Sequence, residues 1–228
     1  MPIDEGVNTD LQFLVLEVKK QARASQSMVE KPTEKKLAKI KVREDYVENL
    51  KNTLENKSYY HIHKTVKETR QMNYFRALIT ISSNLERCAD FFAHIGVQMT
   101  HVKRIKSFEP FVLKRYYQVV YKALDLIYPA LTEHDLDLAH RICDYEQELD
   151  DYYDVSYELA RSKLKQGRNF EDMLTLMNII RYLERAGDCF LNIGEAILDI
   201  HVGQKMGIRQ FRNLRRGLES QKIDIRAD

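Results

Sequence analysis

Several structural signals are scarce in this 228-residue sequence, and each scarcity narrows the range of folds. Glycine occurs only 8 times and proline only 4 times, and clusters of the residues that form tight hairpin turns are nearly absent. A strand-rich fold needs such turns, so the composition favours an all-α fold. The chain is long enough to bury a substantial core, as one domain or as two small ones.

Cysteine is scarce as well. Cys88, Cys143 and Cys189 are too few and too scattered for a disulfide framework or a thiolate zinc site, so we expect buried, reduced thiols in a reducing compartment. The N-terminus lacks the basic start and apolar run of a signal peptide, and no apolar run approaches the length that spans a bilayer. These absences predict a cytoplasmic protein without direct membrane insertion.

Charge of one sign is not in excess, and several catalytic patterns are missing. Charged residues make up 31% of the chain but nearly cancel to +2, which does not favour nucleic-acid or membrane binding. There is no glycine-rich phosphate loop, and the spacing supports no Ser-His-Asp or Cys-His arrangement. None of the 7 histidines follows a glutamate by three residues, which disfavours a ferritin-type di-iron site.

Apolar side chains at helical spacing predict helices along most of the chain. Thr33 is a suitable N-cap, and Gly167 suits a helix C-cap. Pro110 marks the clearest boundary, since proline disfavours helix in the residue before it and suits the first turn of a helix. We therefore predict domains at residues 1–106 and 107–228. The predicted helices cover residues 9–22, 33 to a break near 56–60, 63–102, 111–131, 134–165, 171–203 and 207–219, with a loop at 23–32.

Two pairs of acids spaced by four residues interrupt helix faces that are otherwise apolar. Glu184 and Asp188 lie within about 40° of each other on a helix, on the face that also carries Met177. Glu86 and Asp90 repeat this arrangement 98 residues earlier. A carboxylate in a low-dielectric interior either takes up a proton or recruits a cation, so we expect a compensating group near each pair.

A further acidic pair precedes each of these. Glu146 and Asp150 precede Glu184 on an apolar face, and Glu44 and Glu48 occupy a similar place before Glu86, although their match is weaker. The offset between the two blocks is 102 residues for this pair, which is consistent with one helical hairpin repeated twice. Each repeat would supply four acids.

Four carboxylates that face one another need compensation, because two like charges about 4 Å apart repel by roughly 4 kcal/mol at an effective dielectric of 20. A metal ion is one solution, since carboxylates suit magnesium, calcium, manganese and iron. Pairing with Arg87, Arg185 or a basic residue of a neighbouring helix is the other. His94, four residues after Asp90, is either an added ligand or an ordinary structural or surface histidine. The residues alone leave these alternatives open.

The predicted last helix is short, basic and amphipathic. It places Lys205, Arg209 and Arg212 around Ile208 and Phe211. Such a helix either docks on a partner or acidic surface, or presents an ordinary solvated face.

The run Leu183-Glu184-Arg185-Ala186-Gly187-Asp188, followed by Asn192-Ile193-Gly194-Glu195-Ala196, resembles the PhoU family of phosphate-uptake regulators. A second copy of this motif, Leu85-Glu86-Arg87-Cys88-Ala89-Asp90, lies at the expected repeat spacing. The resemblance is strong over residues 111–203 and weaker over 37–100. The first 30 or so residues diverge from the family, and their helix looks short for it.

The resemblance implies two tandem three-helix bundles, each holding a multinuclear metal cluster through Glu/Asp-x-x-x-Asp motifs, with iron or zinc preferred and manganese or magnesium as alternatives. The implied ligands are Glu44, Glu48, Glu86 and Asp90 in one bundle, and Glu146, Asp150, Glu184 and Asp188 in the other. Glu48 stands where the family has aspartate.

The resemblance also implies a role. Members of this family are regulators and not enzymes. They restrain phosphate uptake and phosphate-responsive signalling through a high-affinity phosphate ABC transporter and a phosphate sensor histidine kinase, and we expect a cytoplasmic homodimer that does likewise. A metal-free helical adaptor for another transporter is the main alternative, and a carboxylate-bridged metal enzyme is a further one.

Overall fold

The computed structural model describes residues 5–64, 68–102, 110–167, 170–202, 207–210 and 213. Within these ranges the secondary structure is helical and includes no strand, which confirms the all-α prediction. The predicted basic helix at 207–219 lies largely outside the described residues. The helices are α1 (Glu5–Glu30), α2 (Glu34–Lys64), α3 (Thr69–Gln98), the 3-10 helix η1 (Met99–His101), α4 (Pro110–Thr132), α5 (Leu136–Lys165) and α6 (Phe170–Val202).

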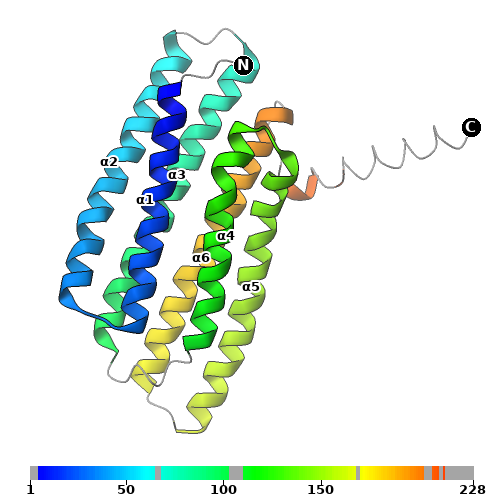
Figure 1. Cartoon of the computed structure of the whole chain (residues 1–228). Helices are drawn as coiled ribbons and strands as arrows, with labels where there is room; N and C mark the ends of the chain where they lie inside the picture. Colours follow the sequence, from blue (N-terminus) through cyan, green and yellow to red (C-terminus); the bar gives the residue numbers. More distant parts are fainter. Residues whose placement is uncertain are drawn as a thin grey trace, which may run out of the picture.

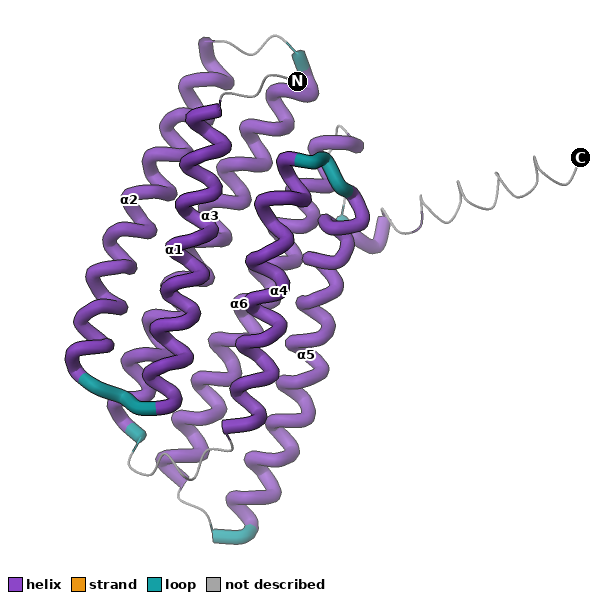
Figure 2. Tube along the Cα trace, viewed as in Figure 1, coloured by secondary structure: helices purple, strands orange, loops and turns teal. Residues whose placement is uncertain are grey.

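The helices form two three-helix bundles side by side (Figures 1 and 2). Helices α1 to α3 form one bundle and α4 to α6 the other, as the resemblance implied. Between the bundles α1 packs against α4 and α3 against α6, whereas α2 and α5 lie at opposite outer edges (Figure 1). No helix in the described part of the chain is both long enough and apolar enough to cross a bilayer.

Local sequence signals set several helix ends. The Lys36 amide donates to Thr33 Oγ1 at 3.3 Å, so Thr33 caps α2 as predicted. Asp135 Oδ1 accepts from the amides of Asp137 and Leu138 at 2.9 and 3.0 Å and caps α5. Gly167 has a φ of 77° just after α5, a left-handed conformation that glycine adopts without steric cost.

The prediction was wrong for the first two helices and for the start of the third, which was expected at residue 63, whereas residues 63 and 64 belong to α2 and α3 begins at Thr69. Helix α1 has 26 residues and continues to Glu30, through most of the loop expected at 23–32, because Ser25 and Met28 are both buried against other helices. The Ser25 hydroxyl shares a 2.6 Å hydrogen bond with the Tyr117 hydroxyl of α4. Helix α2 continues through the predicted break at 56–60, where Ser58 is buried and donates to the Leu54 carbonyl at 2.8 Å. Tertiary burial therefore overrides the weak local periodicity of both segments.

The α3–α6 interface is antiparallel and repeats itself about a pseudo-twofold axis. Asn192 Nδ2 donates to Asn84 Oδ1 at 3.2 Å. His94 packs on Tyr182, with ring centroids 5.3 Å apart. The 98-residue repeat offset relates Asn84 to Tyr182 and His94 to Asn192, so one pair is the counterpart of the other. Cys88 and Cys189 are buried near the centre of this interface as free thiols, as expected.

Candidate functional site

The second-bundle acids come from facing helices at one level. Glu184 and Asp188 lie on α6, and Glu146 and Asp150 on α5. Burial raises the pKa of the Glu184 carboxyl, and the charges of Asp188 and Asp150 raise it further. Burial likewise raises the pKa of Asp150, again with a contribution from Asp188. The charges of Asp150, Glu184 and Asp188 therefore affect one another's ionisation across the α5–α6 interface.

Two glycines bring α5 and α6 close together at this level. A Cβ atom on Gly187 would lie 3.3 Å from the Glu146 Cα atom, which places the Glu146 backbone directly opposite the turn between Glu184 and Asp188. Seven residues further along α6, a Cβ atom on Gly194 would lie 2.8 Å from the Ala139 carbonyl oxygen. Residues seven apart lie on the same helix face, so the two glycines together allow the close approach that makes the acids face one another.

Arginine partly compensates the second set. Arg181 Nη1 donates to Glu184 Oε1 at 2.8 Å, and the Arg181 guanidinium lies 5.7 Å from the centre of the Tyr153 ring. Glu184 Oε2 is buried and has no hydrogen-bond partner in the structure. A buried carboxylate oxygen without a donor is costly, so Arg181 satisfies only half of this group.

The first-bundle acids are also brought together. Glu44 and Glu48 lie on α2, facing Glu86 and Asp90 on α3. Burial raises the pKa of Asp90 to about 7, and the charges of Glu86, Glu44 and Glu48 each contribute. Without a cation, Asp90 is therefore about half protonated at neutral pH.

A fifth carboxylate belongs to the first set and was missed from the sequence. Burial raises the pKa of Glu86 most, Lys51 lowers it, and the charge of Glu48 raises it. Glu55, two turns after Glu48 on α2, raises it further. Glu55 Oε1 accepts from Ser83 Oγ at 2.9 Å, and Glu55 Oε2 lies 3.4 Å from Lys51 Nζ. The i, i+4 spacing of Lys51 and Glu55 predicts only their mutual pairing. Their contact with α3 depends on how the two helices pack.

The acids lie at the edge of each core rather than inside it. Glu48 and Asp188 are exposed, and the other six predicted acids are half-buried. The expectation that the acids of α3, α5 and α6 share the face that meets the core is therefore corrected, whereas an exposed position was already expected for Glu44 and Glu48. The helix faces that carry them border the core stripe, where Val47 on α2 and Leu183 on α6 are fully buried. His94, considered as an added ligand, instead has its ring against Tyr182 of the other bundle.

The carboxylate ligands of both sets suit a cation, but their side chains are not arranged to coordinate one in this structure. In the described ranges, no three histidine, cysteine, aspartate or glutamate side chains are placed so that they could hold one ion. Each set nevertheless offers several carboxylates, which suit hard and borderline metal ions. A bound cation would give the unpaired Glu184 Oε2 a partner and would lower the raised pKa of Asp90.

The repeat seen in the fold is also found by comparison with known families. The PhoU domain model matches the chain twice, over residues 14–99 and 113–197, which together make up most of its length. The chain belongs to the PhoU family. One match covers most of α1 to α3 and the other most of α4 to α6, so each PhoU domain corresponds to one three-helix bundle.

Curated proteins similar to this chain are named as PhoU homologs. The chain is 26% identical over 185 residues to phosphate-specific transport system accessory protein PhoU homolog 1 of Thermotoga maritima, covering 80% of this chain and 78% of the relative. It is 24% identical over 157 residues to a PhoU homolog of Caulobacter vibrioides, covering 68% of each. This PhoU-family chain is therefore similar to accessory proteins of phosphate transport systems over much of its length.

Solved structures show the same fold. PhoU from Streptococcus pneumoniae aligns with a TM-score of 0.82 at 17% identity, covering 90% of this chain and 97% of that structure. PhoU from Pseudomonas aeruginosa aligns with a TM-score of 0.79 at 16% identity, covering 88% and 97%. Such low identity demonstrates the shared PhoU fold alone.

Proposed function

We propose that this chain is a PhoU regulator that restrains phosphate uptake and quiets phosphate-responsive signalling when phosphate is plentiful. The observation that carries the proposal is the double PhoU domain match, one domain on each bundle. The names of the relatives, accessory proteins of phosphate-specific transport systems, support it. Its partners in this proposal are a high-affinity phosphate ABC transporter and a phosphate sensor histidine kinase, reached from the cytoplasm by a homodimer.

Metal binding is part of the proposal. Glu44, Glu48, Glu86 and Asp90 would hold one set of ions, and Glu146, Asp150, Glu184 and Asp188 the other, with iron or zinc preferred over manganese or magnesium. The bound cations would supply positive charge where like charges gather. The carboxylates of this chain bind and orient, and no catalytic step is assigned to them.

A metal-free helical adaptor is the second candidate, and one contact favours it. The Arg181–Glu184 ion pair already places a cation at the second set. If such pairs are the only compensation, the acids are structural charges and the two bundles act as a rigid scaffold for a partner.

The regulatory role is tested in cells of the source organism. Deleting the gene should raise expression of a phosphate-responsive reporter in phosphate-rich medium, and restoring the wild-type gene should silence it. Unchanged reporter expression after deletion would remove the regulatory proposal. The result does not depend on whether metal binds.

The metal sites are tested by elemental analysis of protein purified without chelator and without an immobilised-metal column. The Glu184→Gln/Asp188→Asn variant should lose about half of the bound metal, because one of two sets is disabled. Asp137→Asn/Glu158→Gln is the control, since both acids are exposed on α5 and lie about two helical turns away from Glu146 and Asp150. Equal metal content in the two variants would refute the assignment, and no metal in any of them would leave the adaptor.

A further inference from the structure

Helix α2 has a second surface of interest, separate from its acids. It buries Ile40, Val47 and Leu54, which are spaced by seven and form a narrow core stripe. Glu44 and Glu48 border this stripe on the side of α3. On the other side, toward α1, the exposed residues Lys35, Lys39, Val42 and Tyr46 lie further round the helix from the stripe. These four residues have no role in the acid sets.

A shallow groove lies between α1 and α2 at these four residues. It has a volume of about 490 Å³ and is lined by Glu17, Lys35, Ala38, Lys39, Val42, Arg43 and Tyr46. From Lys35 to Tyr46 the lining residues extend over twelve positions of α2, about 16 Å or three helical turns. That length suits one short helix of a partner.

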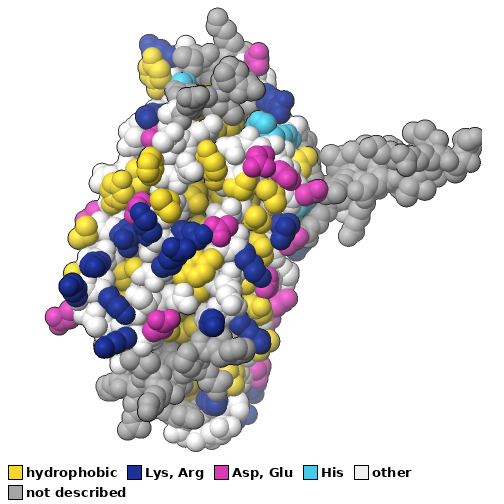
Figure 3. Space-filling view, in the orientation of Figure 1, with side chains coloured by type: hydrophobic (Ala, Val, Ile, Leu, Met, Phe, Trp, Pro, Cys, Tyr) yellow, Lys and Arg dark blue, Asp and Glu magenta, His cyan; other side chains and the backbone are white. Residues whose placement is uncertain are grey.

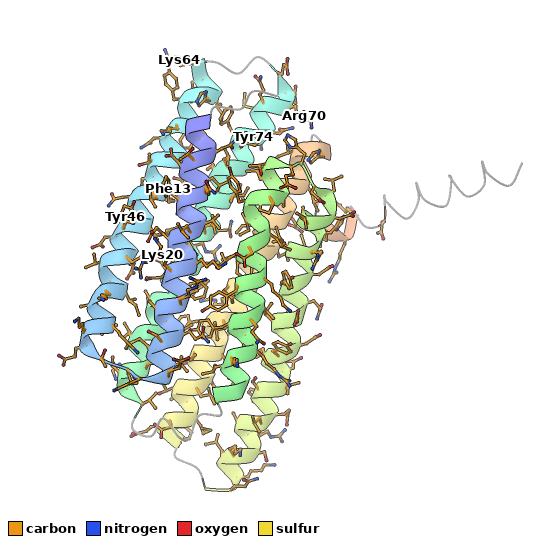
Figure 4. All side chains as sticks on the ribbon, in the orientation of Figure 1. Phe13, Lys20, Tyr46, Lys64, Arg70 and Tyr74 are labelled. Atoms are coloured by element: carbon orange, nitrogen blue, oxygen red, sulfur yellow. The ribbon has the colours of Figure 1, made fainter. Side chains whose placement is uncertain are left out.

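The groove is flanked by unusually exposed apolar side chains. Val42 is 71% exposed and Tyr46 is 49% exposed on α2, and Phe13 and Leu16 are 51% and 43% exposed on α1. Figure 4 shows Phe13 and Tyr46 on neighbouring helices at one side of the molecule, with Lys20 close by. Exposed apolar side chains gathered in this way, rimmed by charge, are typical of a protein-interaction site.

The charge of this face is positive and only partly neutralised. Glu17 pairs with both Lys20, at 2.6 Å, and Arg43, at 3.2 Å, so the one acid of the groove is already shared by two cations. No carboxylate of the described residues forms an ion pair with Lys35 or Lys39. In Figure 3 the Lys and Arg side chains gather over α1 and α2 with apolar side chains between them. The face therefore complements an acidic partner.

We propose that this α1–α2 groove docks an acidic, amphipathic helical segment of a partner protein. Apolar side chains of that segment contact Phe13, Val42 and Tyr46, and its carboxylates reach Lys35 and Lys39. The lining residues follow α2 for about three helical turns, which matches the length of a single short partner helix. The proposed regulatory function specifies neither this surface nor the chemistry of the partner that it would bind.

A second copy of this chain is a less suitable occupant, although it offers the right chemistry. The outer face of α5 carries exposed Asp151, Asp154 and Glu158 around Val155, which is 70% exposed. However, α2 and α5 lie at opposite edges of the molecule (Figure 1). Contacts between them would run head to tail and would not close into a twofold dimer. We therefore assign the groove to another protein.

The test uses a fluorescein-labelled peptide of about 18 residues, long enough for five helical turns, with leucine along one helix face and glutamate elsewhere. Its fluorescence anisotropy should rise on titration with the full chain and fall again as salt is raised from about 0.1 M to about 0.5 M, because screening weakens the ion pairs. A peptide with lysine in place of glutamate should not bind. Absence of binding by the acidic peptide would overturn the proposal.

Matched variants locate the contact. Val42→Asp should weaken peptide binding by about tenfold or more, and Lys39→Glu by several-fold. Val155→Asp is the control, since Val155 has nearly the same exposure on α5, and it should leave binding unchanged. Both valines are surface residues, so neither substitution should prevent folding, which circular dichroism checks. Equal loss of binding in the two valine variants would contradict the assigned surface.

Two other occupants are distinguished in the same protein. Flotation with vesicles containing anionic phosphatidylglycerol that is abolished by Val42→Asp, without peptide binding, would make the face a membrane contact and overturn the proposal. Concentration-dependent assembly in sedimentation velocity that is abolished by both Val42→Asp and Val155→Asp would make it a contact between copies, with the same consequence.

Discussion

Replacing Gly194 by alanine tests whether close helix packing brings the second set of acids face to face. A Cβ atom at this position would lie 2.4 Å from Cys143 Sγ and 2.8 Å from the carbonyl oxygen of Ala139. The sulfur could rotate away, but the carbonyl belongs to the backbone of α5. Helices α5 and α6 would therefore have to move apart.

The expected loss of stability follows from two opposing terms. Forcing a methyl group into a packed interface costs about 1–3 kcal/mol. Alanine favours the helix over glycine by about 1 kcal/mol, which offsets part of that cost. We expect Gly194→Ala to lower the free energy of unfolding by up to about 2 kcal/mol. For a chain of this length, Tm should fall by roughly 2–4 °C per kcal/mol.

The counterpart glycine of the first bundle is the control. A Cβ atom on Gly96 would lie 2.9 Å from Ile40 Cδ1, the flexible end of a side chain, and at ordinary contact distances from other atoms. Gly96→Ala should therefore be near neutral or slightly stabilising, by up to about 1 kcal/mol. Urea unfolding and thermal melts followed by circular dichroism measure both variants. Equal stability of the two would refute the reasoning that backbone proximity at Gly194 sets the α5–α6 spacing.

Two further outcomes are expected. In chelator, Asp90→Asn should stabilise the protein at pH 8 by about 1 kcal/mol, a value reduced for solvent screening, because the folded-state pKa of Asp90 is raised from 3.8 to about 7. As the pH rises from about 4 to about 7, the wild type should lose this stability and the variant should not, which pH-dependent denaturation measures. Parallel pH profiles of the two proteins would contradict the prediction. Tyr117→Phe should cost about 1–3 kcal/mol by leaving the buried Ser25 hydroxyl without its partner. The double variant with Ser25→Ala should recover part of that loss in chemical denaturation, and additive losses would exclude the coupling.

Much of the fold could be predicted from the sequence because strong apolar periodicity marks most of its helices. The second bundle was predicted within a few residues, since Pro110 and Gly167 provide clear end signals. The first two helices were not, because their polar residues are buried by contacts with distant segments. Gln21, for example, is fully buried and donates to the Ile40 carbonyl of α2 at 3.0 Å. Such a contact has no local signature.

The acids were found from spacing alone, but their environments were not. A four-residue spacing places Glu86 and Asp90 on one helix face without saying how near α2 lies. The structure shows that the first set, whose sequence match is weaker, contains the acid with the pKa raised to about 7. Glu55 and the unpaired oxygen of Glu184 both depend on packing between helices and so escaped prediction. The exposed groove residues were equally hidden, since periodicity does not show which face of α2 meets solvent.

The pseudo-twofold interface between α3 and α6 has a consequence for how such a chain can change. In a dimer of identical bundles, every substitution alters both sites at once. Here each half is encoded separately, so a mutation in one bundle leaves its counterpart intact. The halves already differ, since Lys51 and Glu55 accompany the first set and Arg181 pairs with the second. Two sites that respond to different concentrations of protons or cations would turn a single on–off response into a graded one.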